Sequence, residues 1–184
     1  MRPRPARAAD GAMLMHFTRA SARASALDNL IAILRGGVIR GSRRMVRGRA
    51  SVVCLFDMPL GELAGLLQPR NRRRYQPFGI AIDKRYAFIK GARPVIYLPW
   101  KEASAILNQD EHWRAVNIDL QSRRSVDWTF EREWRVPGDL RLDARSCVAL
   151  VGGWRDADEL YDCFEGRPPC AGVLPVGELG GVRK

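Results

Sequence analysis

The chain has 184 residues, of which 31 are Lys or Arg and 20 are Asp or Glu, and its formal net charge is +11. A hydrophobic content of 46%, arranged in periodic segments, excludes a disordered chain. No apolar run approaches the ~20 residues that a membrane helix needs, so we expect no membrane partner. The length favours one domain, and the charge favours polyanionic partners such as RNA, DNA or a phosphate-bearing cofactor.

The four cysteines show no paired Cys-x-x-Cys spacing, and the chain has two histidines. A zinc site of the usual spacing is therefore not expected, and we predict no metal. Nothing in the spacing indicates a disulfide framework, which favours a cytoplasmic protein.

The chain begins with a tail and a short strand. Residues 1–12 combine Arg, Pro and Ala without a period, and we expect a disordered basic tail there. Residues 13–184 are expected to form a single α+β domain. The apolar run 13–18 predicts its first strand, with His16 near the end.

A helix, a basic loop and a central strand follow. Ser25 is a typical N-cap for a helix that begins at Ala26, and the Gly-Gly pair at 36–37 would end it. The loop 40–49 then carries five arginines. The continuous apolar run 50–56 predicts the strongest strand of the chain, which we expect to be central in a sheet.

Asp57 follows this strand and allows two interpretations. It could place a carboxylate at the edge of the sheet, or it could cap the next helix, expected over 60–67. Pro59 suits the first turn of a helix and favours the cap. A second basic run at 70–74 ends at Tyr75, whose ring could stack on a base or nicotinamide or could anchor the loop.

The second half of the chain predicts short elements joined by polar segments. Apolar runs predict strands at 78–82, 93–98, 127–137 and 147–151, followed by a Gly/Pro-rich end near 173–176. Helical segments are expected at 102–117 and 157–164, and a turn or short helix at 83–88. Short strands and short helices in mixed order indicate an α+β fold.

The run 127–137 carries two carboxylates. As a strand, it places Glu131, Glu133 and Arg135 on one face and mainly large apolar side chains on the other, which should pack on the core. The two carboxylates would then lie about 6.5–7 Å apart along the strand. Close carboxylates repel, so either a surface strand neutralises them with Arg132 and Arg135 or a function requires them.

His16 and Thr18 lie at the end of the first predicted strand, where both side chains would point to the same side. A histidine at such a position can be structural. An imidazole and a hydroxyl so placed can also hydrogen-bond a ribose or an amide. The residues alone leave both interpretations open.

Several motifs occur in a characteristic order: His-Phe-Thr at 16–18, Val-Cys-Leu-Phe-Asp-Met-Pro-Leu at 53–60, Tyr-x-x-Phe-Gly-Ile at 75–80, Arg-Pro-Val-Ile-Tyr-Leu at 93–98 and Glu-Arg-Glu-Trp-Arg at 131–135. In this order they resemble the AbiGi-type abortive phage-resistance proteins over about residues 15–137. The resemblance implies a small bacterial protein of phage defence and toxin–antitoxin-like loci, in a family usually labelled an antitoxin. It also implies a cognate partner protein.

The chain also resembles ADP-ribosyltransferases, especially the branch that modifies nucleic acid. His16, Tyr75 and Glu133 follow the order of site residues in that superfamily, and Glu131 completes its Glu-x-Glu pattern. The resemblance implies split sheets, NAD as the cofactor, and Glu133 and Glu131 as catalytic residues. Glu133 would hold the ribose 2′-hydroxyl and stabilise developing positive charge, while Glu131 would orient the substrate. The implied NAD-binding residues are His16, Thr18, Tyr75 and Arg135.

We therefore expect an ADP-ribosyltransferase-like α+β domain that uses NAD to modify a nucleic-acid or protein target in phage defence. Its expected nucleic-acid-binding residues are Arg43, Arg44, Arg47, Arg72, Arg73 and Arg74. The alternative is a non-catalytic antitoxin-like or regulatory module that binds nucleic acid or a partner protein through its basic face. A nuclease is least favoured, because the paired acids have no clear third metal-binding partner.

Overall fold

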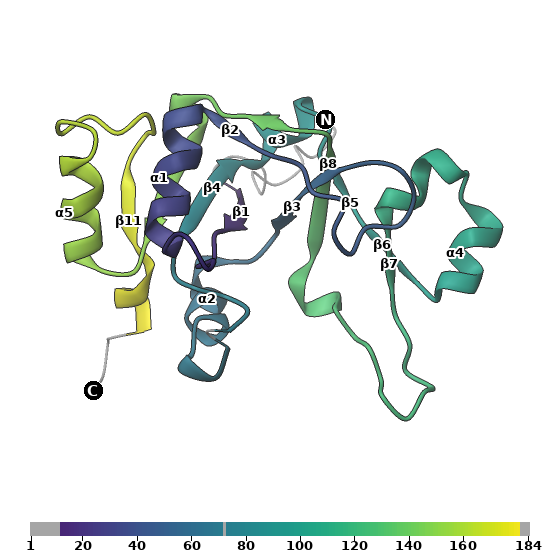
Figure 1. Cartoon of the computed structure of the whole chain (residues 1–184). Coiled ribbons are helices and arrows are strands. Elements are labelled where there is room, and N and C mark those ends of the chain that lie inside the picture. Colours follow the sequence, from purple (N-terminus) through teal and green to yellow (C-terminus); the bar gives the residue numbers. More distant parts are fainter. Residues whose placement is uncertain (1–11, 72, 181–184) are drawn as a thin grey trace, which may run out of the picture.

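The computed structural model describes residues 12–71 and 73–180 and shows the α+β fold that the sequence predicts (Figure 1). Its strands are β1 (Met13–Phe17), β2 (Val38–Ile39), β3 (Val52–Phe56), β4 (Gly79–Asp83), β5 (Arg93–Pro94), β6 (Ile96–Leu98), β7 (Ala115–Asn117), β8 (Glu133–Pro137), β9 (Leu140–Arg141), β10 (Cys147–Val151) and β11 (Val173–Pro175). A mixed seven-stranded sheet has the order β11-β10-β4-β1-β3-β8-β5, and β2–β9 and β6–β7 form two small sheets.

Five short α-helices are described: α1 (Ala26–Gly36), α2 (Leu60–Leu66), α3 (Lys84–Ile89), α4 (Trp100–Ile106) and α5 (Trp154–Asp162). None of the helices in the described part of the chain is long and apolar enough to cross a membrane. The tail expected at 1–12 falls outside the described residues except for Ala12, and the single domain at 13–184 stays a prediction.

The start and end of α1 follow the local sequence signals. The Ser25 hydroxyl accepts a hydrogen bond from the Asp28 N–H (3.0 Å), and the Asp28 carboxylate accepts one from the Ser25 N–H (2.8 Å). The helix ends at Gly37, which has a left-handed backbone (φ +60°) that glycine adopts without a steric penalty. The predicted cap and stop are therefore confirmed.

Both faces of the large sheet are covered, and strand alternation decides which residues reach each face. Leu14, Ile80 and Ile82 pack with α1 and α5 in one buried core. Met15 and Ala81 pack with α2 in a second core on the other face. The two cores fix β1 and β4 in the middle of the molecule.

The large sheet is split between β1 and β3. Each of these strands pairs along its whole length with a neighbour on its outer side, β1 with β4 and β3 with β8. Within the described part of the chain, β1 and β3 pair with each other at Met15 and Phe56 alone. The two halves of the sheet are therefore joined at one residue pair, as the expected split sheets require. Gly79 lets β4 approach the end of β1, because a Cβ at this position would lie 2.2 Å from the His16 carbonyl oxygen.

The predicted strand 93–98 is divided between two sheets. β5 pairs with β8, whereas β6 pairs in parallel with β7. After β5, the chain turns away from β8 at Glu133, where two hydrogen bonds to the Glu133 backbone fix its path. The Val95 N–H donates to the Glu133 carbonyl (3.0 Å), and the Tyr97 hydroxyl accepts from the Glu133 N–H (2.8 Å). The predicted helical segment 102–117 is also divided, into α4, a 3-10 helix at Gln109–Arg114, and β7.

The run 127–137 is a strand only from Glu133 onward. The Asp127 carboxylate accepts hydrogen bonds from the backbone N–H (2.9 Å) and the hydroxyl (2.6 Å) of Thr129, which stabilises a turn. A 3-10 helix covers Thr129–Glu131, and Arg132 then has a left-handed backbone (φ +45°). The sequence prediction of a continuous strand was therefore wrong, because a local side-chain turn replaces its first half.

The faces predicted for this run hold within β8, where Trp134 and Val136 pack on the core and Glu133 and Arg135 line the cavity, and they fail before it. Phe130, expected in the core, is 48% exposed. Glu131, Glu133 and Arg135 are all buried. The acids are therefore not on a solvent-facing strand; they face the interior opening of the split sheet.

Asp57 does not cap α2. Pro59 occupies the cap position, and no side chain bonds to the helix end. The Asp57 carboxylate pairs with the Lys84 ammonium group, which lies 4.8 Å from the centroid of the Trp134 ring. The favoured interpretation of Asp57 was wrong, because α3 supplies a cation that the local sequence could not indicate.

Candidate active site

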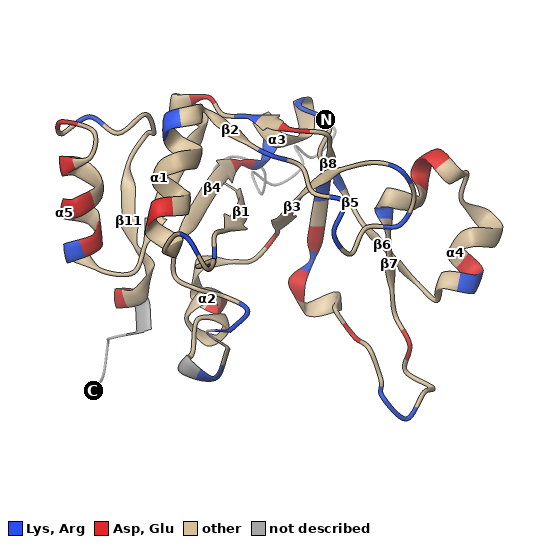
Figure 2. Ribbon diagram, in the orientation of Figure 1, with Lys and Arg blue, Asp and Glu red and all other residues tan. Residues whose placement is uncertain are grey.

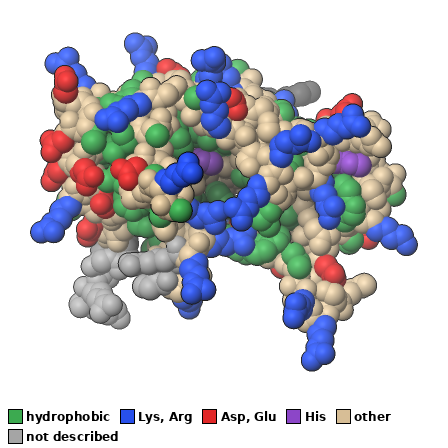
Figure 3. Space-filling model, viewed as in Figure 1, with side chains coloured by type: hydrophobic (Ala, Val, Ile, Leu, Met, Phe, Trp, Pro, Cys, Tyr) green, Lys and Arg blue, Asp and Glu red, His purple; other side chains and the backbone are tan. Residues whose placement is uncertain are grey.

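The split between β1 and β3 opens into a cavity of about 380 Å³. Residues from β1, β3, β7 and β8 supply its walls, together with the loop between β2 and β3 and the residues before β4. Figure 3 shows a hollow near the middle of the molecule, with Lys and Arg side chains beside it. The predicted site residues that the structure brings to this cavity are His16, Arg44, Arg74, Tyr75, Glu131, Glu133 and Arg135.

His16 lies at the end of β1 and bridges the split. Its Nδ1 is 3.0 Å from the Cys54 carbonyl oxygen on β3. Because a carbonyl only accepts, this bond requires the proton on Nδ1 and leaves Nε2 as an acceptor. Burial lowers the pKa of His16, and the bond to Cys54 only partly opposes this effect. The imidazole is therefore neutral at pH 7.

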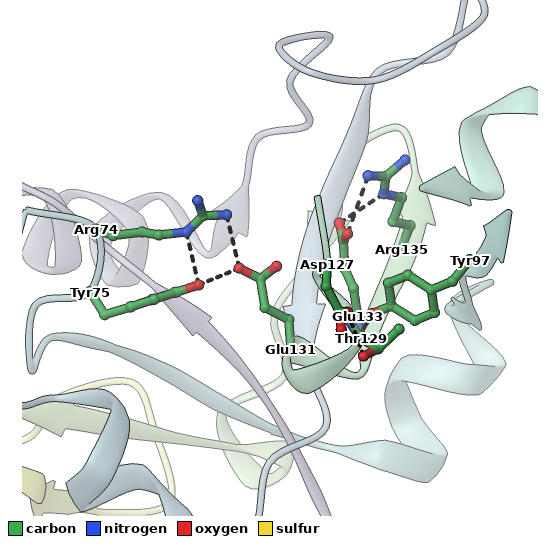
Figure 4. A network of polar contacts seen from close by, with 8 residues as sticks. All are labelled: Arg74, Tyr75, Tyr97, Asp127, Thr129, Glu131, Glu133 and Arg135. Carbon is green, nitrogen blue, oxygen red and sulfur yellow. Dashed lines mark hydrogen bonds and ion pairs between the residues drawn. The ribbon is translucent and has the colours of Figure 1, made fainter. Parts of the chain in front are cut away.

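Tyr75 combines an aromatic anchor with a buried hydroxyl. Its ring makes edge contacts with Phe17 and Phe56, with centroids 6.3 and 5.9 Å away. Its hydroxyl donates a hydrogen bond to Glu131 (Figure 4). Burial raises the pKa of Tyr75, and the neighbouring Glu131 raises it further. Tyr75 is thus a protonated donor that anchors its loop, which is one of the two interpretations given above.

Arg74 completes the network around Glu131. Its Nε donates to the Tyr75 hydroxyl (2.8 Å), and its terminal nitrogen Nη2 donates to Glu131 Oε1 (2.9 Å) (Figure 4). The guanidinium carbon also lies 3.8 Å from the centroid of the Trp128 ring. Burial raises the pKa of Glu131, although the bonds from Tyr75 and Arg74 act in the opposite direction. The site therefore holds a carboxyl group whose ionised form is disfavoured.

Glu133 and Arg135 form a separate, buried ion pair on β8. Arg135 Nε donates to Glu133 Oε1 (2.8 Å), and Nη2 donates to Oε2 (3.2 Å). The remaining terminal nitrogen, Nη1, donates to the carbonyls of Trp113 (2.6 Å) and Ala115 (3.4 Å). Burial acts to lower the pKa of Arg135, but the bonds to Glu133 outweigh it and raise the pKa. Both oxygens of Glu133 are thus held in fixed positions at the cavity wall.

Cys54 also lines the cavity but is not suited to nucleophilic chemistry. Burial and the charge of Glu133 raise the pKa of its thiol to about 12. The thiolate is the reactive form of cysteine, so the group is inert at neutral pH. Among the described residues, no group of three or more His, Cys, Asp or Glu side chains could hold a metal ion.

Thr18 is not in this cavity. Its hydroxyl donates to the Ala26 carbonyl (2.8 Å) at the start of α1. It lines an adjoining cavity of about 790 Å³, which shares His16, Arg19 and Arg44 with the first. The structure therefore places Thr18 and Glu133 in two different cavities that share lining residues.

Among the described residues, the arginines predicted to contact nucleic acid have different surroundings. Arg74 is directed into the cavity network, and Arg44 lines both cavities. Arg43 is exposed, and Arg47 lies over the Trp100 ring, 4.8 Å from its centroid. Arg72 lies outside the described residues. Figure 2 shows acidic residues gathered on α5, on the opposite side of the molecule from α4.

Arg73 lies in a groove of about 530 Å³ outside the first cavity. Arg74, Tyr75 and Trp128 line both spaces and separate them. The groove is also lined by Arg70, Arg73 and Phe130, and by one carboxylate, Glu62. The rings of Trp128 and Phe130 are 6.1 Å apart and tilted by 50°. Basic and aromatic side chains therefore meet directly beside the cavity.

Three site residues were missed by sequence reasoning. Arg19 lines both cavities, Trp128 covers Arg74, and the Tyr97 hydroxyl positions the Glu133 backbone. Arg19 could have been found, because it follows the strand that carries His16. Trp128 and Tyr97 contact residues far away in sequence, and no local pattern indicates those contacts.

Comparisons with known proteins identify no family. No family model matches the sequence, and neither does any curated protein. Among solved structures, Thermus sp. 2.9 DarT in complex with carba-NAD+ is 12% identical, with a TM-score of 0.49 over 91% of this chain and 97% of that chain. The same protein in complex with NAD+ is 13% identical, with a TM-score of 0.46 over 89% of this chain and 96% of that chain. These similarities are distant, and we transfer no property of DarT from them.

Proposed function

We propose that the chain is an ADP-ribosyltransferase-like protein that binds NAD in the split-sheet cavity and modifies a nucleic-acid or protein target. The observation that supports it most is one cavity that collects His16, Tyr75, Glu131 and Glu133 from three distant parts of the chain. Following the AbiGi resemblance, we further propose a role in bacterial phage defence, in the cytoplasm and with a cognate partner protein.

The two adjoining cavities fit a dinucleotide in volume and in charge. Their volumes of about 380 and 790 Å³ lie in the range of small-molecule sites. The described lining of the larger cavity includes Arg19, Arg40 and Arg44 and no carboxylate, which suits a pyrophosphate. The nicotinamide end would then lie in the smaller cavity, beside His16 and Glu133. Bound there, NAD would supply an ADP-ribosyl group through cleavage of its nicotinamide–ribose bond.

The carboxylates take different roles in this proposal. Glu133 is fixed by Arg135 and would hold the ribose 2′-hydroxyl and stabilise positive charge at the ribose. Glu131 has a raised pKa and would orient the attacking group of the target. The neutral His16, through Nε2, would accept a hydrogen bond from a ribose hydroxyl.

The groove outside Arg74 supports a nucleic-acid target. Trp128 and Phe130 offer faces for base stacking, and Arg70 and Arg73 offer charge for phosphates. The groove meets the cavity at Arg74, so a base stacked there would lie next to Glu131.

A second candidate is a non-catalytic binding module, antitoxin-like or regulatory. It is favoured by the way in which the carboxylates are already engaged. Arg135 bonds to both oxygens of Glu133, and Glu131 accepts from Tyr75 and Arg74. In this reading the acids stabilise the fold, and the basic and aromatic groove binds a nucleic acid or a partner protein.

The test is transfer of a radiolabelled ADP-ribosyl group from NAD to nucleic acid or protein by the full chain. The informative variant is Glu133→Asp, which keeps a charge for Arg135 but moves the carboxylate back by one methylene. We expect its transfer rate to fall about 10²–10³-fold. Arg35→Gln, which alters an arginine stacked on Phe164 away from the site, is the control and should keep parental activity. A folded parent that transfers nothing to any target would leave the binding module as the function.

A further inference from the structure

The segment 40–51 between β2 and β3, here called the strap, forms one wall of the smaller cavity. Ser42, Arg44 and Met45 of the strap line that cavity. Its first residues are well anchored: Arg40 Nη1 and the Gly41 N–H donate to Asp139 (2.6 and 2.8 Å). Ser42 also bridges to Val52 through two backbone bonds (2.8 and 2.9 Å). The lining residues after Ser42 are held within the strap by bonds from the Arg44 N–H to the Ser42 hydroxyl (3.1 Å) and from the Val46 N–H to the Arg43 carbonyl (3.3 Å), so their distance from the sheet also depends on how the far part of the strap is held.

The far part of the strap rests on α4 and on the 3-10 helix that follows it. The Arg47 guanidinium lies 4.8 Å from the centroid of the Trp100 ring, within the range of a cation–π contact. Trp100 makes an edge contact with His112, with ring centroids 5.0 Å apart. Gly48 (φ +83°) packs so closely on His112 that a Cβ would lie 3.3 Å from His112 Cβ. Met45 lies between the bonds to Asp139 and the contacts with Trp100 and His112, and its side chain is 80% exposed. Figure 1 shows this segment reaching from β2 across β8 toward α4.

Residues 100–117, which receive the strap, also hold the opposite wall of the cavity. The Trp113 and Ala115 carbonyls accept hydrogen bonds from Arg135 (2.6 and 3.4 Å), the residue that fixes Glu133. Val116 lines the cavity itself. The same short segment therefore sets the distance between the strap and the ion pair.

We propose that Arg47 and Trp100 form a latch that holds the strap closed over the cavity. Arg47 is in this view a positioning residue: it touches no reacting group, but it sets Arg44 and Met45 against the cavity. When the latch opens, residues 43–49 swing away from 100–117 and the cavity opens to solvent. The latch itself follows from the contacts above, while its effect on NAD rests on the proposed function.

Limited trypsin digestion of the ligand-free full chain tests the latch directly, because the part of the strap that would move, residues 43–49, offers cleavage after Arg43, Arg44, Arg47 and Arg49. Cleavage of a transiently open segment tracks the population of the open form. Trp100→Leu keeps every trypsin site and removes the ring face under Arg47, so we expect about two- to five-fold faster cleavage in the strap. Arg35→Gln removes a similar arginine–aromatic contact, 5.7 Å from the Phe164 ring, and should leave strap cleavage unchanged.

Arg47→Gln is the second variant, and its cleavage rate is measured at the three remaining sites, Arg43, Arg44 and Arg49. If Trp100→Leu does not fold, Arg47→Gln provides the test of the latch. Parental cleavage rates in a folded variant would overturn the latch. A second readout concerns NAD: opening the latch should raise KM without lowering kcat, because bound NAD holds the strap closed. If the parent does not use NAD, the proposed function fails and the proteolysis result still stands. If NAD is used and strap cleavage is unaffected, the latch alone fails.

Discussion

Glu133→Gln should destabilise the fold, and the structure gives the size of the effect. From the sequence alone, this substitution is expected to leave folding intact, because glutamine keeps the shape and the hydrogen-bonding capacity of Glu133. In the structure, Glu133 and Arg135 are 7% and 5% exposed and share two hydrogen bonds. Removing the charge of Glu133 leaves a buried guanidinium without its counterion.

The expected loss can be worked out from this geometry. Removing one partner of a buried ion pair costs about 3–5 kcal/mol. The Gln side chain keeps one oxygen for Arg135, so we expect the lower end, about 3 kcal/mol. With a urea dependence of about 2 kcal/mol per M, the unfolding midpoint should fall by about 1.5 M.

Urea unfolding followed by tryptophan fluorescence measures this loss. Glu62→Gln is the matched control, because Glu62 pairs with Arg132 at 3.2 Å but both side chains are about half exposed. Its loss should stay below about 1 kcal/mol. The double variant Glu133→Gln/Arg135→Met removes the uncompensated charge and should recover part of the stability. A Glu133→Gln loss as small as that of the control would refute the reasoning, and so would a double variant no more stable than the single one.

Three further predictions concern the surroundings of the cavity. Because burial raises the pKa of Glu131 from its ordinary 4.5, the parent should lose stability relative to Glu131→Gln as pH rises from about 4.5 through that raised pKa. Urea midpoints at several pH values measure this difference, and the opposite slope would show that ionised Glu131 stabilises the fold. Tyr75→Phe keeps the ring but removes a buried donor, so thermal unfolding should report a loss of about 1–3 kcal/mol; a neutral effect would contradict the network. Replacing Arg70 and Arg73 with Gln should weaken binding of a single-stranded oligonucleotide and reduce its logarithmic salt slope by about 2. Fluorescence anisotropy measures it, and an unchanged slope would exclude phosphate contacts in the groove.

The elements that the sequence predicted well are those whose signals are local. The cap at Ser25, the stop at Gly37 and the apolar run of β3 depend on residues next to each other in the chain. For these features, short-range propensity and the final packing agree. The shared cavity of His16, Tyr75 and Glu133 is not a local feature, and it was indicated by the resemblance to ADP-ribosyltransferases.

The errors share a different cause. The strand predicted at 93–98 divides because Val95 and Tyr97 bond to the backbone of Glu133, a residue more than thirty positions away in the sequence. In the sequence, Arg74 is one member of a basic run. In the structure, it donates a hydrogen bond to Glu131, 57 residues later. Tertiary contacts of this kind override local propensity, and nothing in the neighbouring residues could indicate them.

The most direct test of the NAD site is a structure of the chain with a non-hydrolysable NAD analogue. We predict that the nicotinamide ribose lies in the smaller cavity, within hydrogen-bonding distance of Glu133 and His16, and that the pyrophosphate lies beside Arg19 and Arg44. An analogue bound elsewhere, or none bound at saturating concentration, would contradict it.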